Sequence, residues 1–175
     1  HELTVGSVPA GTMLPNPSLL INDYYNDPTD AQKEAVAKLM LYCGTSVGMD
    51  YTSSASSAHT SRVADALISY FGFDNTTKFV HRANYTYAMW IDLIYDELVA
   101  ARPVEYDGHS SGGGHAFVID GYDRDDLFHV NWGWGGSSDG YFALSVLNPD
   151  DDGQIGASGS SDGYSGSQGA MIHCQ

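Results

Sequence analysis

Apolar residues recur three and four positions apart in three stretches of the chain, which is the spacing of an amphipathic helix. The predicted helices cover residues 30–43, 61–71 and 87–101. Thr29 or Asp30 can cap the start of the first helix, and Gly44 follows that helix as a stop signal. A helical region is therefore expected in the first part of the chain.

Later in the chain the pattern changes to the short apolar runs and the alternation that are typical of strands. The predicted strands cover residues 78–82, 103–106, 115–122, 127–132, 140–145 and 170–174. Residues 150–169 are rich in Gly, Ser and Asp, so we expect a mobile loop there. Helices followed by an antiparallel sheet make an α+β domain, and 175 residues suit a single domain over residues 1–175.

Two motifs carry the chemistry: GGGHAFVIDG at residues 112–121 and HVNWGWGG at residues 129–136. They put His115 at the start of one strand and Asn131 at the end of the next, and an antiparallel hairpin brings these ends together. An imidazole held by a carboxamide oxygen is the acid–base half of a cysteine-protease site. We therefore expect Asn131 to orient His115, and Trp132 to shield their hydrogen bond from water.

These motifs resemble the streptopain/interpain family of bacterial cysteine endopeptidases. The resemblance runs from Asp30 to the C-terminus and includes GTSVGMDY at residues 44–51. It implies a papain-like fold and a Cys–His–Asn endopeptidase that cuts protein substrates. It also implies that substrate contacts Ser57 and Ala58, and that the substrate main chain runs antiparallel to Gly114, where glycines allow close approach.

The nucleophile that the resemblance implies has no counterpart among the two cysteines. Cys43 ends a predicted helix, where the partial negative charge of the helix disfavours a thiolate, and Cys174 is the penultimate residue. A bridge between them and two unpaired thiols both remain open. We expect this chain to be the C-terminal part of a longer enzyme, with an N-terminal segment of the same enzyme as the partner that supplies the cysteine and most of the oxyanion hole.

The net charge argues against some classes of partner. Seven basic and 22 acidic residues give a net charge of −15, which argues against nucleic acid and anionic membranes as partners. No apolar run reaches membrane-spanning length. The composition and the resemblance favour a secreted, cell-surface or periplasmic bacterial protein that binds protein substrates and a propeptide or inhibitor, without a cofactor.

Two alternatives to a peptidase remain. The first is a non-catalytic secreted binding module of the adhesin type, which would explain the missing nucleophile. The second is a calcium site, because residues 148–153 imitate the start of a calcium loop; Gly159 stands where the closing glutamate is needed, so we expect no metal there. A zinc site of His109, His115 and His129 would need supporting side chains that the sequence does not indicate.

Overall fold

The structure is a computed structural model that describes residues 8–9, 11–53, 55–123, 125–149 and 163–175. By its internal contacts the chain divides into two compact units, His1–Arg62 and Val63–Gln175. The expectation of one domain over residues 1–175 stays a prediction. Most of the predicted loop at residues 150–169, and of the calcium-like stretch at residues 148–153, lies outside the described residues.

The first unit is built around one long helix. Its elements are η1 (Pro17–Leu19), α1 (Asp30–Ser46), β1 (Asp50–Tyr51), β2 (Ser56–Ser57) and η2 (Thr60–Arg62). Thr29 caps α1 as predicted, in a capping box with Gln32. The predicted stop at Gly44 is wrong, because α1 continues to Ser46. Gly44 is buried, and a Cβ atom there would lie 1.7 Å from the Tyr51 hydroxyl, so this glycine makes room for a side chain.

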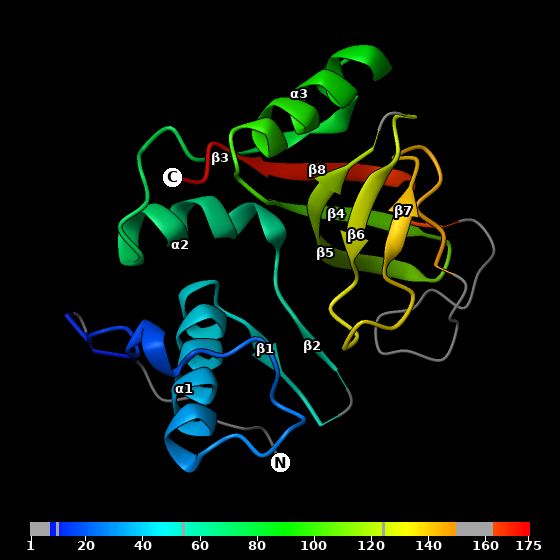
Figure 1. Cartoon of the computed structure of the whole chain (residues 1–175). Helices are drawn as coiled ribbons and strands as arrows, with labels where there is room; N and C mark the ends of the chain where they lie inside the picture. The colour runs from blue at the N-terminus through cyan, green and yellow to red at the C-terminus, as the bar shows by residue number, and fades with distance from the viewer. Residues whose placement is uncertain (1–7, 10, 54, 124, 150–162) are drawn as a thin grey trace. The chain divides into compact units, whose positions relative to one another are not determined.

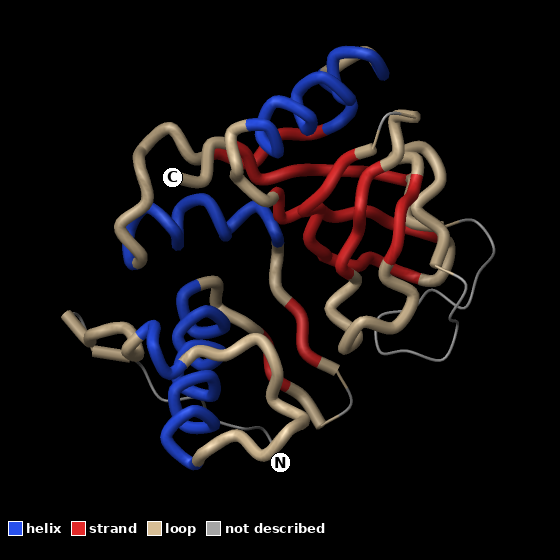
Figure 2. The backbone as a smooth tube through the Cα atoms, viewed as in Figure 1, coloured by secondary structure: helices blue, strands red, loops and turns tan. Residues whose placement is uncertain are grey.

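The second unit contains two further helices and a six-stranded antiparallel sheet. Its elements are α2 (Val63–Tyr70), β3 (Lys78–His81), η3 (Arg82–Asn84), α3 (Tyr87–Val99), β4 (Val104–Ser110), β5 (Gly113–Tyr122), β6 (Phe128–Asn131), β7 (Gly140–Phe142) and β8 (Gly166–Ile172). The strand order is β3-β8-β4-β5-β6-β7 (Figure 1), and the strands form one continuous layer in Figure 2. The α+β class is confirmed. Residues 166–169 belong to β8, so the predicted loop is wrong there.

The core of this unit lies between α3 and the buried face of the sheet. Trp90 and Ile94 of α3 are fully buried, and Trp90 Nε1 donates a hydrogen bond of 2.8 Å to the Tyr106 hydroxyl on β4. Phe117 on β5 lies against Tyr106, with ring centroids 5.5 Å apart. Aromatic side chains bury large areas and pack best at fixed angles, so this layer fixes the position of β5 relative to the helix.

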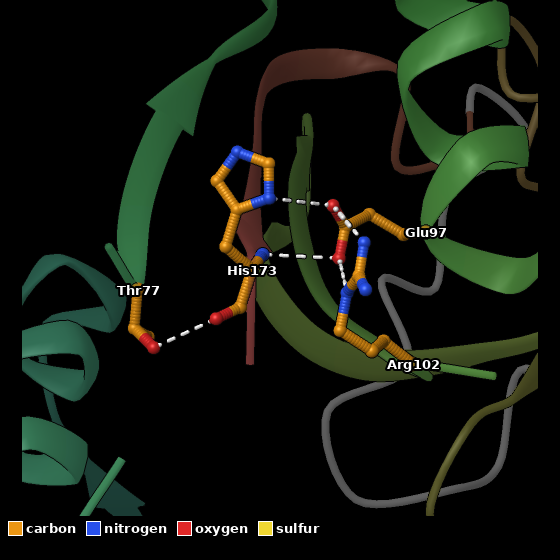
Figure 3. A network of polar contacts seen from close by, with 4 residues as sticks. All are labelled: Thr77, Glu97, Arg102 and His173. Atoms are coloured by element: carbon orange, nitrogen blue, oxygen red, sulfur yellow. Dashed lines mark hydrogen bonds and ion pairs between the residues drawn. The ribbon is translucent and has the colours of Figure 1, made fainter. Parts of the chain in front are cut away.

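A polar network joins the end of α3 to the last strand (Figure 3). The Glu97 carboxylate is 2% exposed and accepts hydrogen bonds from Arg102 Nε at 2.7 Å and from the His173 main-chain N–H at 3.0 Å. The His173 ring also reaches this carboxylate, with Nδ1 at 3.0 Å. Thr77 donates to the His173 carbonyl oxygen at 2.9 Å. The chain that follows β8 is thus held at three of its polar groups.

In the described part of the chain, no helix combines the length and the apolar character needed to cross a membrane.

Candidate active site

The His115 imidazole is held by a main-chain carbonyl group. Nε2 lies 2.9 Å from the Trp132 carbonyl oxygen. Because a carbonyl can only accept, Nε2 carries the proton and donates, and in the neutral ring Nδ1 is the unprotonated nitrogen. The ring is thus fixed in the tautomer that a general base needs.

The hydrogen bond expected between His115 and Asn131 is replaced by this contact. Side chains alternate between the two faces of a strand. His115 shares its face with the buried Phe117, whereas Asn131 pairs with Val118 on the other face. The Asn131 Oδ1 atom accepts a hydrogen bond of 2.9 Å from the Gly133 N–H. Sequence spacing located the right strand ends, but the next residue along the chain supplies the acceptor.

Trp132 is held by two hydrogen bonds to consecutive residues. It is fully buried, its N–H donates to Asp139 Oδ1 at 2.9 Å, and its indole Nε1 donates to the Ser138 carbonyl oxygen at 3.0 Å. Its ring is nearly parallel to that of His115, with centroids 6.3 Å apart. Trp132 therefore offers His115 both an acceptor and an aromatic wall.

Two further aromatic residues surround the imidazole, and sequence reasoning gave neither a role. The Trp134 ring stacks on His115 with centroids 5.0 Å apart, and the Tyr164 ring lies at 5.5 Å. The WGW spacing was a usable signal for Trp134. Tyr164 follows residues 150–162, which lie outside the described part of the chain, and it is distant in sequence from the other site residues, so only the folded chain reveals it.

This environment favours the neutral imidazole. Burial lowers the pKa of His115, and the hydrogen bond to the Trp132 carbonyl, which raises it, offsets only part of that effect. A neutral ring with a free Nδ1 lone pair can accept a proton from a nucleophile. The aromatic faces can stabilise the cation that forms.

The residues expected to contact substrate are found in both units. Gly114 is exposed on β5, directly before His115, and pairs with His109 of β4. Ser57 on β2 and Ala58 are exposed in the first unit. Their contacts with substrate stay a prediction.

Neither cysteine has the properties of a nucleophile. Cys43 and Cys174 are both free thiols. Burial raises the pKa of Cys43. Burial, together with the nearby charge of Glu97, raises the pKa of Cys174 to about 11. Among the described residues, no three His, Cys, Asp or Glu side chains are grouped so that they could hold a metal ion.

The model of the peptidase C10 family matches residues 15–142. The chain belongs to the peptidase C10 family. Streptopain of Streptococcus pyogenes is 41% identical over 153 residues, which is 87% of this chain and 38% of streptopain. The thiol protease/hemagglutinin PrtT of Porphyromonas gingivalis is 38% identical over 139 residues, 79% of this chain and 16% of that protein.

Two solved structures agree with the fold. Active interpain A of Prevotella intermedia superimposes with a TM-score of 0.79 at 36% identity, covering 89% of this chain and 62% of that one. A prointerpain A fragment gives 0.75 at 35% identity, covering 92% and 48%. The predicted family and papain-like α+β fold are confirmed. The chain spans well under half of the streptopain length and under two thirds of the interpain A chain.

Proposed function

We propose that this chain supplies the acid–base half and part of the substrate cleft of a C10 cysteine endopeptidase. The observation that carries the proposal is the His115 imidazole, fixed through Nε2 by the Trp132 carbonyl and kept neutral by burial. The nucleophilic cysteine and most of the oxyanion hole come from an N-terminal segment of the same enzyme. The match covers 62% of the interpain A chain, and the uncovered part of that chain is long enough to include such a segment.

The reaction uses the two nitrogens of His115 differently. Nδ1 takes the proton of the cysteine thiol, which gives a thiolate and an imidazolium, and the thiolate attacks the scissile carbonyl. The imidazolium then returns the proton to the leaving amine. Throughout, Nε2 donates to the Trp132 carbonyl, whose partial negative charge stabilises the cationic ring.

Trp132 and Asn131 act on His115 rather than on substrate. Trp132 presents the acceptor and walls off the ring. Asn131 is a positioning residue, because its bond to the Gly133 N–H turns the chain directly after the Trp132 carbonyl. Gly133 has a φ of +79°, which suits a glycine at this turn.

Protein chains are the proposed substrates. Gly114 contacts the substrate main chain, and Ser57 with Ala58 lines the pocket for the residue two before the cut. A propeptide or an inhibitor would bind in place of the substrate. We place the enzyme outside the bacterial cytoplasm, as a secreted, cell-surface or periplasmic protein made as a zymogen.

The test is a pair of histidine variants in the complete enzyme. His115→Ala should abolish peptide hydrolysis, because it removes the ring that takes the proton from the thiol. His129→Ala is the matched control, since His129 is a partly exposed histidine that pairs with Asp120 at 2.6 Å. Near-normal turnover by His115→Ala would refute the proposal, and peptide binding without turnover by the unaltered enzyme would favour the non-catalytic binding module.

A further inference from the structure

His109 is an exposed histidine on β4 that the proposed reaction leaves without a role. Its register partner on β5 is Gly114, the residue directly before His115. His109 Nε2 lies 2.7 Å from the point that a Cβ atom on Gly114 would occupy. The imidazole therefore extends from β4 across the glycine, into space that a side chain at position 114 would fill.

Among the described residues, the far edge of β5 has no paired strand beside this glycine. β4 pairs with β5 over residues 113–119, whereas β6 pairs with β5 only from Val118 onward. After Asn131 the chain leaves β6 in a turn at Gly133, and residues 132 and 134 contact His115 without pairing with β5 as a strand. No described strand pairs with residues 113–117 on that side. An open strand edge next to a general base can receive an extended peptide as an added strand.

The geometry of a sheet then determines which side chains meet. Residues opposite each other in paired strands point to the same face, and adjacent strands lie about 4.8 Å apart. A substrate residue opposite Gly114 would place its side chain on the face of His109, about 10 Å from the β4 backbone. Because Gly114 has no side chain between them, the imidazole and that substrate side chain become neighbours.

We propose that His109 is a specificity-determining residue that hydrogen-bonds the side chain of the substrate residue lying opposite Gly114. This inference rests on the proposed function. It adds a side-chain contact to the main-chain approach at Gly114.

Charge excludes a carboxylate, and hydrogen bonding selects among the other side chains: a cationic side chain only donates, whereas a carboxamide can use both ring nitrogens. Asp107 lies on the same face of β4 as His109, two residues before it, and would repel a substrate carboxylate. The residues that flank His109 on the neighbouring strands are Gly114 and Ala116 on β5 and Gly166 on β8, none of which titrates. An imidazole offers one N–H donor and one acceptor nitrogen, which matches a neutral carboxamide. The preferred substrate residue is therefore glutamine or asparagine.

The experiment compares glutamine with leucine in otherwise identical peptides, at each of the four positions around the cut. The complete enzyme should show a higher kcat/KM for glutamine at one of these positions. His109→Ala should lower that glutamine-to-leucine ratio about fivefold, the worth of one hydrogen bond. His109→Gln, which keeps a donor and an acceptor, should retain most of the preference.

His81→Ala is the matched control, because His81 is an exposed histidine on β3 whose ring contacts Phe79. It should leave the ratio unchanged. An unchanged ratio in His109→Ala at all four positions would overturn the inference while the peptidase proposal stands, as would an equal rise in hydrolysis of every peptide. If the complete unaltered enzyme cut no peptide, the proposed function itself would fail, and this inference with it.

Discussion

Burial lowers the pKa of His115 in the folded chain below its ordinary value of 6.5. As the pH falls through that value, the unfolded chain binds a proton that the folded chain does not, so folding stability is lost on the acid side and is complete above it. The free energy of unfolding should therefore drop more between about pH 7.5 and about pH 5.5 in the unaltered chain than in His115→Gln. Urea denaturation at both pH values measures this, and equal losses would contradict it.

Asn131 offers a second prediction at the residue scale. Asn131→Ala in the complete enzyme should lower kcat/KM about tenfold, the lower end of the cost of losing an orienting group, and far less than His115→Ala. The acidic limb of the pH–rate profile should move as well, because the acceptor that holds His115 is less well placed. Asn131→Asp keeps an oxygen for the Gly133 N–H and should restore most of the rate. A loss of stability without any change in the pH profile would mean that Asn131 is only structural.

At the scale of elements, β4 packs against Tyr164, whose ring lies beside His115. A Cβ atom on the buried Gly108 would lie 2.0 Å from the Tyr164 carbonyl oxygen, which is main chain and cannot rotate away. Gly108→Ala should therefore cost about 2 kcal/mol of stability and lower the activity of the complete enzyme, since Tyr164 contacts the His115 ring. Thermal unfolding and peptide hydrolysis check this.

Gly140→Ala on β7 is the control for that variant. A Cβ atom there would meet the Phe142 ring at 3.7 Å, an ordinary contact. The idea fails if both alanine variants behave alike.

The polar network around Glu97 gives a prediction for the contact between α3 and the chain that follows β8. Burial alone would raise the pKa of Glu97, but hydrogen bonds from Arg102 and the His173 N–H hold it below its ordinary value. Glu97→Gln should cost about 3 kcal/mol, because Arg102 loses its charged partner. Asp96→Asn, at the exposed neighbouring position, should change stability little. Denaturant titration of the two variants compares them, and similar midpoints would contradict the prediction.

For the molecule as a whole, the proposed division of the enzyme can be tested directly. The 175-residue chain alone should cut no peptide, and Cys43→Ala should leave the complete enzyme active. Both follow from the raised pKa values of the two thiols. Hydrolysis by the isolated chain that disappears in Cys43→Ala would make Cys43 the nucleophile and overturn the assignment.

Local patterns predicted most of this fold, and long-range contacts explain the errors. The apolar periodicity located the helices and the alternation located the strands, because both depend on neighbours close in sequence. Gly44 was misjudged since its partner, Tyr51, becomes visible only after folding. β8 starts earlier than predicted because its first residues are Gly166 and Ser167, which carry no strand signal, and Gly166 pairs with His109 of β4.

Some residues of the candidate site could likewise be predicted from local patterns, and others only from the fold. His115 and Trp132 could be found from the motifs, because their residue types indicate chemistry. The acceptor for His115 could not, since every residue has a carbonyl group and the sequence does not say where it points. Strand alternation turned the Asn131 side chain to the other face, and Tyr164 is brought in by the fold alone.

A main-chain acceptor has a consequence for how this site tolerates genetic change. No single codon change can delete the Trp132 carbonyl, so the contact with His115 survives as long as the backbone path survives. Selection on residue 132 then acts on the volume of its buried indole, and selection on residue 131 acts on the turn that this residue stabilises. In a survey of all substitutions, activity should follow side-chain size at residue 132 and turn propensity at residue 131. A homologue that lacks the asparagine is not an inactive enzyme on that ground alone.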